Sequence, residues 1–169
     1  MKEILNRRSI RKFKPGAVTD EQVHDILMAA MSAPNGFSTK EWEFIVVRSE
    51  EGYEKLERVQ KWGKFARNSD VFIIVCGDTH KETSEQLVAL NVGAAIQNML
   101  TEATYLGLGS LWLGVYSNDQ FVADIQREFN IPSHIIPMGA IVIGHADQTL
   151  KPHDKFYADK VHKELFGQK

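Results

Sequence analysis

Apolar residues recur at helical spacing in three stretches of the chain, and two of these stretches begin with a recognisable helix-start signal. Thr19 and Gln22 have the form of a capping box, in which each side chain binds the backbone N–H of the other residue. Residues 117–120 have the same form and predict the start of another helix. The helices predicted in this way cover residues 20–32, 83–106 and the stretch from 118 to Pro132, and a polar helix is expected over residues 50–60.

Runs rich in β-branched and aromatic residues separate these helices and predict strands. Residues 70–76 are almost continuously apolar, so this strand must be covered on both faces and belongs inside a sheet. The predicted strands cover residues 42–47, 70–76, 110–116 and 138–144. We therefore expect a single α+β domain over residues 1–169, with no internal repeat or linker.

Two segments carry more apolar surface than one small domain can cover. Residues 83–106 are apolar or small on more than one face, which predicts a helix buried centrally or against a partner chain. The tail from His145 onward is too polar to fold alone, yet it includes five apolar side chains that need burial. We expect a second subunit to cover the tail residues Phe156, Tyr157, Val161, Leu165 and Phe166.

Composition narrows the function classes without naming one. Hydrophobic residues make up 43% of the chain, charged residues 25%, and the net charge is -2, which gives no general attraction to nucleic acid or membrane. The one cysteine, Cys76, lies in an apolar run, which predicts a buried thiol and a reducing, cytoplasmic location. The N-terminus has no apolar leader, and no window approaches the length of a membrane span. The histidines show no metal-ligand spacing, so no metal site is indicated.

The densest chemical signal is the N-terminal run Arg7, Arg8, Ser9, Ile10 and Arg11. Guanidinium groups bind phosphate oxygens through two parallel N–H groups, and a serine hydroxyl adds a further donor. The run therefore suits a phosphate monoester. The same residues could instead form a solvated basic face, a phosphorylation site or a nucleic-acid patch. The last is disfavoured because the other cations are dispersed among acids.

Two glycine-containing segments could approach a flat ligand. Small residues around Pro34, Asn35, Gly36 and Ser38 let the backbone come close to such a ligand, although this segment could also be a plain helix stop. Residues 107–114 place a glycine turn before an apolar strand, in which Trp112 could equally be a core residue.

The order of these motifs over essentially the whole chain resembles the FMN-dependent nitroreductase family. The resemblance rests on Arg-Arg-Ser-Ile-Arg, Ala-Ala-Met-Ser-Ala-Pro, Trp42 before Phe-Ile-Val-Val, Asn-Val-Gly-Ala-Ala-Ile-Gln-Asn, Gly-Leu-Gly-Ser-x-Trp and Lys151-Pro152. It implies a mainly antiparallel central sheet flanked by helices, in an interlocked homodimer with FMN at the subunit interface. It also implies ping-pong turnover, in which NAD(P)H reduces the flavin and leaves before a small-molecule acceptor enters.

The resemblance also implies roles for individual residues. Arg7, Arg8 and Ser9 would bind the phosphate and ribityl chain of FMN, and His153 and Lys155 would be further phosphate contacts. Arg11 would lie near N1 and the C2 carbonyl of the flavin ring and tune the redox step. The isoalloxazine ring in the partner subunit's site would be lined on one side by Pro34, Asn35, Gly36 and Ser38. Its other side would be covered by Trp112, Leu113 and Gly114. No catalytic side chain is required, because the flavin carries the hydride at N5.

The chain departs from many relatives at the ring-side loop. Where those relatives have Asn-x-Gln-Pro-Trp, this chain has Ser38-Thr39-Lys40-Glu41-Trp42, so Lys40 lies either near the flavin or in solvent. The chain also lacks the long insertion that covers the pocket in larger members, which implies an open, permissive site. We therefore expect an enzyme that reduces nitroaromatics, quinones or similar acceptors. Two alternatives are a flavin-binding or flavin-handling protein with little turnover and a specialised reductive enzyme such as a dehalogenase.

Overall fold

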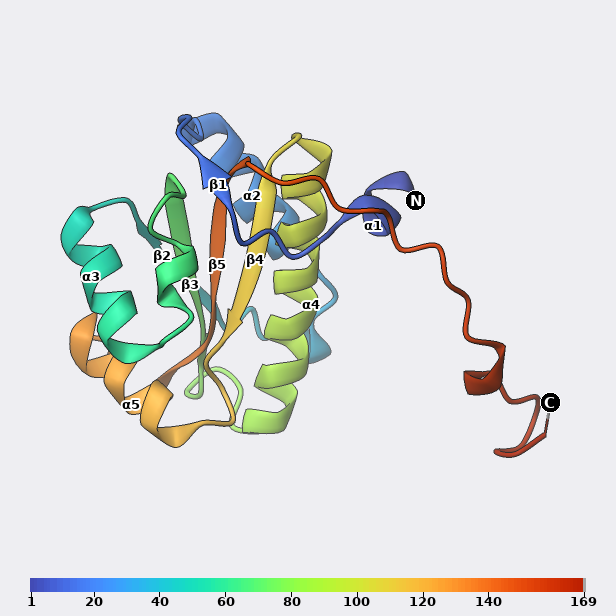
Figure 1. Cartoon of the computed structure of the whole chain (residues 1–169). Helices are drawn as coiled ribbons and strands as arrows, with labels where there is room; N and C mark the ends of the chain where they lie inside the picture. The colour runs from blue at the N-terminus through green and yellow to red at the C-terminus, as the bar shows by residue number, and fades with distance from the viewer. Residues whose placement is uncertain (169) are drawn as a thin grey trace.

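The computed structural model describes residues 1–168 as a sheet between two helical layers, with a long C-terminal tail (Figure 1). In chain order, its elements are α1 (Lys2–Asn6), β1 (Phe13–Lys14), α2 (Asp20–Met31), η1 (Gly36–Ser38), β2 (Trp42–Val47), α3 (Glu50–Val59), η2 (Gly63–Phe65), β3 (Val71–Asp78), α4 (Glu85–Tyr105), β4 (Gly109–Gly114), α5 (Asp119–Glu128), β5 (Ile135–Ala146) and η3 (Ala158–Lys160). None of the helices within residues 1–168 has the length and hydropathy needed to cross a membrane.

The sheet has the order β1-β5-β3-β2, with β4 also paired to β5. All pairs of named strands are antiparallel, which confirms the predicted mainly antiparallel α+β fold. In the centre, Ile73 of β3 lies opposite Ile141 of β5. A bulge between Val75 and Cys76 shifts the register of this pair near the end of β3. The central pairing thus brings the ends of β3 and the start of β5 side by side.

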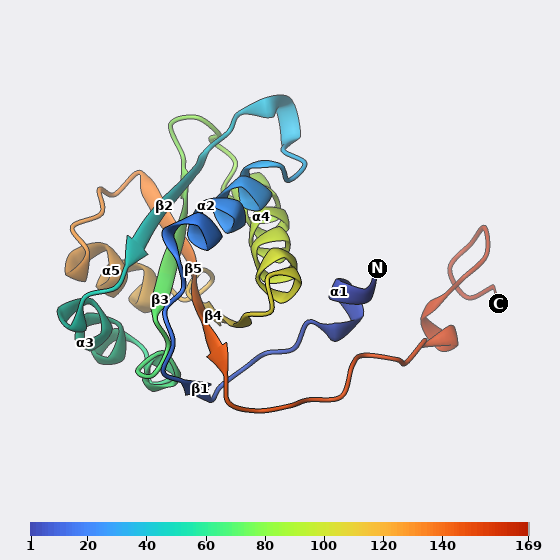
Figure 2. The ribbon, with the colours of Figure 1, turned by 90° about the horizontal axis from the view of Figure 1, so that it is seen from above.

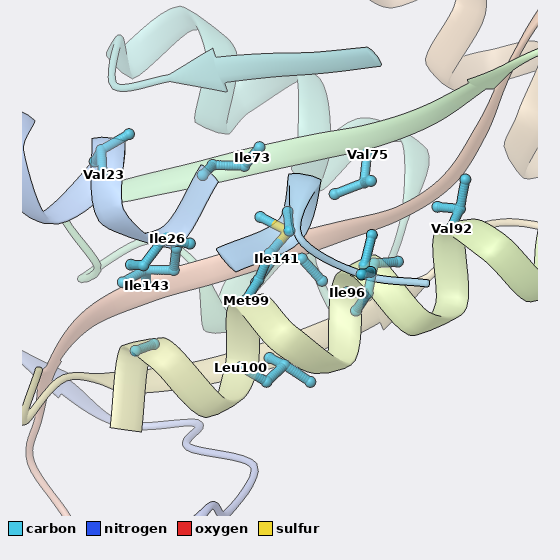
Figure 3. Packing of buried hydrophobic residues seen from close by; sticks show 14 of the residues in the cluster. Val23, Ile26, Ile73, Val75, Val92, Ile96, Met99, Leu100, Ile141 and Ile143 are labelled. Atoms are coloured by element: carbon cyan, nitrogen blue, oxygen red, sulfur yellow. The ribbon is translucent and has the colours of Figure 1, made fainter. Parts of the chain in front are cut away.

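Side chains on the two faces of the sheet pack under different helices, because successive residues of a strand point to opposite faces. Ile73 and Ile141 pack with α2 and α4 (Figure 3). Phe72, Ile74 and Val142 pack on the other face, with residues of α3 and α5. β3 is buried along its whole length, as its apolar run predicts. Cys76 is fully buried within it, which confirms the expected buried thiol.

The first predicted helix end is confirmed, and the second is shifted by one residue. The Gln22 N–H binds Thr19 Oγ1 at 3.1 Å, and Gln22 Oε1 accepts the Thr19 N–H at 3.0 Å. At α5 the expected box at residues 117–120 is wrong, because Asn118 is the N-cap and accepts the Phe121 N–H at 3.0 Å. Ser117 instead has φ 69° and forms the turn before the helix.

All four predicted helices and all four predicted strands are present, with ends shifted by a few residues. α1 and β1 were not predicted. α1 buries none of its residues and has no side-chain cap, so the usual sequence signals are missing. β1 has two residues and pairs only with the end of β5, which is too short for an alternating pattern.

The C-terminal tail leaves the body beside α1 and extends away from both helical layers (Figures 1 and 2). The five apolar tail residues that were expected to need burial are exposed within the single chain. Their exposed fractions are 79% for Phe156, 53% for Tyr157, 48% for Val161, 64% for Leu165 and 94% for Phe166. One chain therefore supplies no cover for this apolar surface.

Candidate functional site

A pocket of about 390 Å³ opens beside β4, between α5 and the segment that follows α3. It is lined by Arg11, Gln60, Trp62, Phe65, Leu111, Trp112, Leu113, Gly114 and Phe121. The structure thus brings together Arg11, Trp112, Leu113 and Gly114, which the family resemblance implies at one flavin ring.

The indole of Trp112 owes its position to a glycine on the neighbouring strand. Gly139 of β5 pairs with Gly114 of β4, and a Cβ at position 139 would collide with the indole ring. Trp112 is 41% exposed, so its side chain lies at the wall of the pocket and not in the core. Trp62 and Phe65 form a second aromatic wall, with stacked rings whose centroids are 5.8 Å apart at an interplanar angle of 6°.

Gln60 is a pocket residue that the sequence did not single out. Its Nε2 donates to the carbonyl oxygen of Gly114 at 2.6 Å, which ties the end of β4 to the segment after α3. Its Oε1 is buried and has no hydrogen-bond partner in the structure. A buried acceptor without a donor costs free energy, so this oxygen is a natural contact for an N–H donor on a bound ligand. A glutamine at the end of a polar helix is ordinary, so the sequence held no signal for it.

The three arginines of the N-terminal run differ from the other four in the chain. Arg48, Arg58, Arg67 and Arg127 each form ion pairs with carboxylates. Among residues 1–168, Arg7, Arg8 and Arg11 have no carboxylate partner; the Arg8 guanidinium binds the Lys151 carbonyl, and Arg11 binds that of Ser9 at 3.4 Å. The run therefore keeps cationic groups available for an anion.

The N-terminal run and the tail lie side by side. The His153 N–H donates to the Leu5 carbonyl at 2.8 Å, and the Arg11 N–H donates to Gln148 Oε1 at 3.0 Å. These bonds place the backbone of residues 148–153 along the arginine run, as the predicted shared anion site requires. Lys155 lies farther along the tail, with its Nζ 4.8 Å from the centroid of the Tyr157 ring.

Ser9 joins this segment to the edge of β4. It forms an isolated bridge with Ser110, and the Ile10 N–H donates to the Ser110 carbonyl at 2.9 Å. The Ser110 hydroxyl is buried and has no partner in the structure. Backbone contacts thus link the N-terminal arginine run to β4, the strand that lines the pocket.

The segment with Pro34, Asn35, Gly36 and Ser38 does not line the pocket of its own chain. It lies instead against α4, where the Gly36 N–H donates to Asn91 Oδ1 at 3.0 Å. Phe37, Ser38 and Lys40 adopt left-handed backbone conformations, with φ between 50° and 56°. Lys40 is exposed in the single chain. The predicted contact of this loop with a partner's ring remains a prediction.

Glu41 fixes this loop through hydrogen bonds to its carboxylate. Its side chain is fully buried, and its carboxylate accepts hydrogen bonds from Asn35 Nδ2 at 2.6 Å, Thr39 Oγ1 at 2.7 Å and Asn91 Nδ2 at 2.7 Å. Burial by itself raises the pKa of Glu41, but these hydrogen bonds and one from the backbone outweigh it, so the pKa lies below its usual value. Sequence reasoning missed Glu41, because one of its partners, Asn91 on α4, is fifty residues away along the chain.

Cys76 offers no nucleophile. Burial raises the pKa of its thiol to about 12, with a smaller contribution from the charge of Glu43. The thiolate is the reactive form of cysteine, so this side chain serves the core.

Comparison with known proteins assigns the family. The model of the nitroreductase family matches residues 4–63 and 57–145. The chain belongs to the nitroreductase family. It is 38% identical over 164 residues to a Methanothermobacter thermautotrophicus protein that carries the name NADH dehydrogenase/NAD(P)H nitroreductase, covering 97% of this chain and 86% of the relative.

Two solved structures of nitroreductase-type proteins have the same fold as this chain. An FMN-dependent nitroreductase from Clostridium difficile aligns with a TM-score of 0.90 at 30% identity, over 98% of this chain and 100% of the other. A Desulfovibrio desulfuricans nitroreductase-type protein, crystallised in complex with FMN, aligns with a TM-score of 0.84 at 30% identity, over 98% and 96% of the two chains. The family model ends at residue 145, so His153 and Lys155 lie beyond the residues it matches.

Proposed function

We propose that this nitroreductase-family protein is an FMN-dependent NAD(P)H oxidoreductase that reduces nitroaromatics, quinones or related small acceptors by ping-pong turnover. The observation that carries the proposal is the pairing of three arginines, which lack carboxylate partners among the described residues 1–168, with an adjacent pocket that holds a buried acceptor without a donor there. The names and ligands of the relatives support the same chemistry.

The residues present fit FMN at both of its ends. Arg7, Arg8 and Ser9 would bind the phosphate and ribityl chain, and the tail residues His153 and Lys155 would add further phosphate contacts. Gln60 would present its orphaned Oε1 to the imide N–H of the ring, which is the complementary donor. Arg11 would place a fixed positive charge at the ring's edge.

The faces of the ring would be bounded by apolar and small residues. Trp112, Leu113 and Gly114 would cover one side, with the stacked Trp62 and Phe65 nearby. The loop that carries Pro34, Asn35, Gly36 and Ser38 would reach the ring of the partner subunit. When bound, FMN supplies two-electron chemistry at N5, so the protein's task is to hold the ring, charge its edge and leave one face accessible.

A spectrum of the purified protein tests the cofactor, and anaerobic mixing tests the activity. We expect yellow protein with the absorption bands of a flavin and bleaching of these bands by NADH or NADPH. Colourless protein that cannot be loaded with FMN would refute the proposal. Flavin that is bound but stays oxidised with both nicotinamides would favour a flavin-handling protein, and product analysis with halogenated substrates would reveal a dehalogenase.

A homodimer is part of the proposal, because the single chain leaves matching apolar surface uncovered. Besides the tail, Leu90 and Tyr105 of α4 are 71% and 69% exposed, and a Cβ at Gly93 would meet no atom within 4 Å. A partner helix and a partner tail would cover these surfaces. The loop at residues 34–41 does not line the pocket of its own chain. In the dimer it would complete the pocket of the partner subunit.

Replacing Phe156 and Phe166 with serine is expected to weaken the dimer. Each ring contributes about 1.5–3 kcal/mol when it is fully buried, and a dimer has four such rings, so the double variant should raise the dissociation constant by at least about 10⁴-fold. Light scattering over a concentration series measures this change. Val46→Ser, which alters an exposed apolar residue on β2, is the control and should leave the dimer intact. A wild-type chain that is monomeric at all concentrations would contradict the assembly.

Gln60→Leu is expected to weaken FMN binding by about tenfold, because the ring's imide N–H loses a buried acceptor worth about 1.5 kcal/mol. Fluorescence quenching during FMN titration measures this affinity. Gln126→Leu is the matched control, since that amide also donates to a backbone carbonyl, of Ile135 at 3.0 Å, but lies outside the pocket. Equal FMN affinity in the wild type and Gln60→Leu would remove Gln60 from the site.

Arg11→Ala is expected to weaken FMN binding and to lower the reduction potential of the bound flavin by about 30–60 mV, because a positive charge at the ring's edge favours the electron-rich form. Dye-equilibration measurements of the potential check this shift. Lys12→Ala removes a neighbouring exposed cation that does not line the pocket, so its potential should match the wild type. An unchanged potential in Arg11→Ala would show that Arg11 lies elsewhere.

A further inference from the structure

Two histidines that are far apart in the sequence meet beside an aspartate at one end of the sheet. The imidazole rings of His80 and His134 stack with centroids 4.0 Å apart and an interplanar angle of 2°. The donor atoms of these rings and of the Asp78 carboxylate all lie within 4.8 Å of one another. None of the three residues lines the pocket proposed for FMN, so this cluster has no part in the proposed flavin site.

The backbone around the cluster is fixed by hydrogen bonds. Asp78 is the last residue of β3 and pairs with Ile135, the first residue of β5. The N–H and Oγ1 of Thr79 both donate to the His134 carbonyl, each at 2.9 Å. Asp78 Oδ1 accepts the His80 N–H at 2.8 Å. The chain therefore presents the three side chains together before any ligand arrives.

We propose that Asp78, His80 and His134 bind one divalent transition-metal ion of the zinc class, with water completing the coordination. Neutral imidazole nitrogens and a carboxylate oxygen are ligands that such ions prefer. A tetrahedral ion with bonds of about 2.0–2.1 Å holds its donors about 3.3 Å apart. The exposed His80 ring can close the remaining distance by side-chain rotation, since its backbone is already placed.

The positive charge of Lys81 opposes the binding of a cation at this site. Its Nζ lies 3.8 Å from Asp78 Oδ2 and 2.9 Å from Glu43 Oε1. A bound ion must work against this ammonium charge, although the closer pair with Glu43 can persist when Asp78 turns to the ion. Removing the charge with Lys81→Met should therefore tighten metal binding, which a chance contact of two imidazoles would not do.

The bound ion would join the end of β3 to the start of β5. It would also lie close to the ring-side loop, because the Asp78 N–H donates to the Glu41 carbonyl at 2.8 Å. The sequence could not indicate this site by spacing, since His80 follows β3 whereas His134 precedes β5.

Calorimetric titration of the untagged, chelator-treated, FMN-loaded protein with Zn²⁺ tests the proposal. We expect one equivalent that is lost or weakened at least about tenfold in His80→Ala, in His134→Ala and in Asp78→Asn. His24→Ala is the matched control, because His24 lies 3.6 Å from Asp25 in an exposed pair with no third ligand. Its affinity should equal that of the wild type.

Thermal unfolding gives a second readout that does not depend on activity. Zn²⁺ should raise the melting temperature of the wild type and leave that of His80→Ala unchanged, because an ion that binds only the folded state stabilises it. His80 is exposed, so its loss leaves the core intact. Zn²⁺ binding that is equally strong in the wild type and His134→Ala, or that weakens equally in His24→Ala, would overturn the proposal.

Discussion

The double variant Arg7→Ala, Arg8→Ala is expected to lose FMN almost completely. Hydrogen bonds from a guanidinium to a charged phosphate contribute about 1.5–3 kcal/mol each, so losing both side chains should raise the FMN dissociation constant by about 10²- to 10⁴-fold. The fold should tolerate the change, because neither guanidinium has a carboxylate partner within residues 1–168 that would be left as an orphaned charge. Fluorescence titration with FMN and thermal unfolding of the apoprotein measure the two effects.

Riboflavin separates a phosphate contact from a general loss of the site. It shares the ring and ribityl chain of FMN but lacks the phosphate, so its affinity should fall far less than that of FMN in the double variant. Arg58→Ala serves as the control, since Arg58 is committed to an ion pair with Glu128 at 2.7 Å. If riboflavin affinity falls as far as FMN affinity, the two arginines support the fold of the pocket and do not bind the phosphate.

The sequence was most informative where one stretch of chain determines its own structure. The apolar run of β3 requires cover on both faces, and the structure buries all of Val71–Asp78. The capping box at Thr19 encodes both of its hydrogen bonds within four residues, and both are present. The family resemblance added the order of the motifs, and the match over residues 4–145 bears it out.

Features that depend on contacts between distant segments gave no sequence signal. Gln60 is singled out only by its contact with the Gly114 carbonyl across the pocket, and His80 only by its contact with His134, which lies just before β5. α1 buries no residue of its own chain, so no amphipathic pattern distinguishes it. The predicted start of the helix at residues 117–120 was wrong for a local reason. Ser117 adopts a left-handed backbone conformation, and the adjacent Asn118, an equally good capping residue, is the N-cap.

Replacing Glu41 with leucine is expected to cost about 2–4 kcal/mol of unfolding free energy. The substitution leaves the partly buried amide of Asn35, the buried amide of Asn91 and the Thr39 hydroxyl without their shared acceptor, and each unsatisfied buried donor costs about 1–3 kcal/mol before relaxation. Glu41→Gln should cost less, because its amide oxygen still accepts. Urea unfolding of the apoprotein measures these differences. Glu43→Gln, on the strand β2 that follows Glu41, removes only an exposed ion pair with Lys81 and should change stability by less than about 1 kcal/mol.

The pH dependence of these differences identifies the charge as the cause. The hydrogen bonds hold the pKa of Glu41 below its usual value of 4.5, so the unfolded chain binds this proton more readily than the folded one. The stability that the carboxylate contributes is therefore complete above about pH 4.5 and is lost as the pH falls through the lower pKa of the folded state. The gap in unfolding free energy between the wild type and Glu41→Gln should shrink over that range. A gap that stays constant there would mean that packing, and not the buried carboxylate, fixes the loop of left-handed residues that carries Ser38 and Lys40.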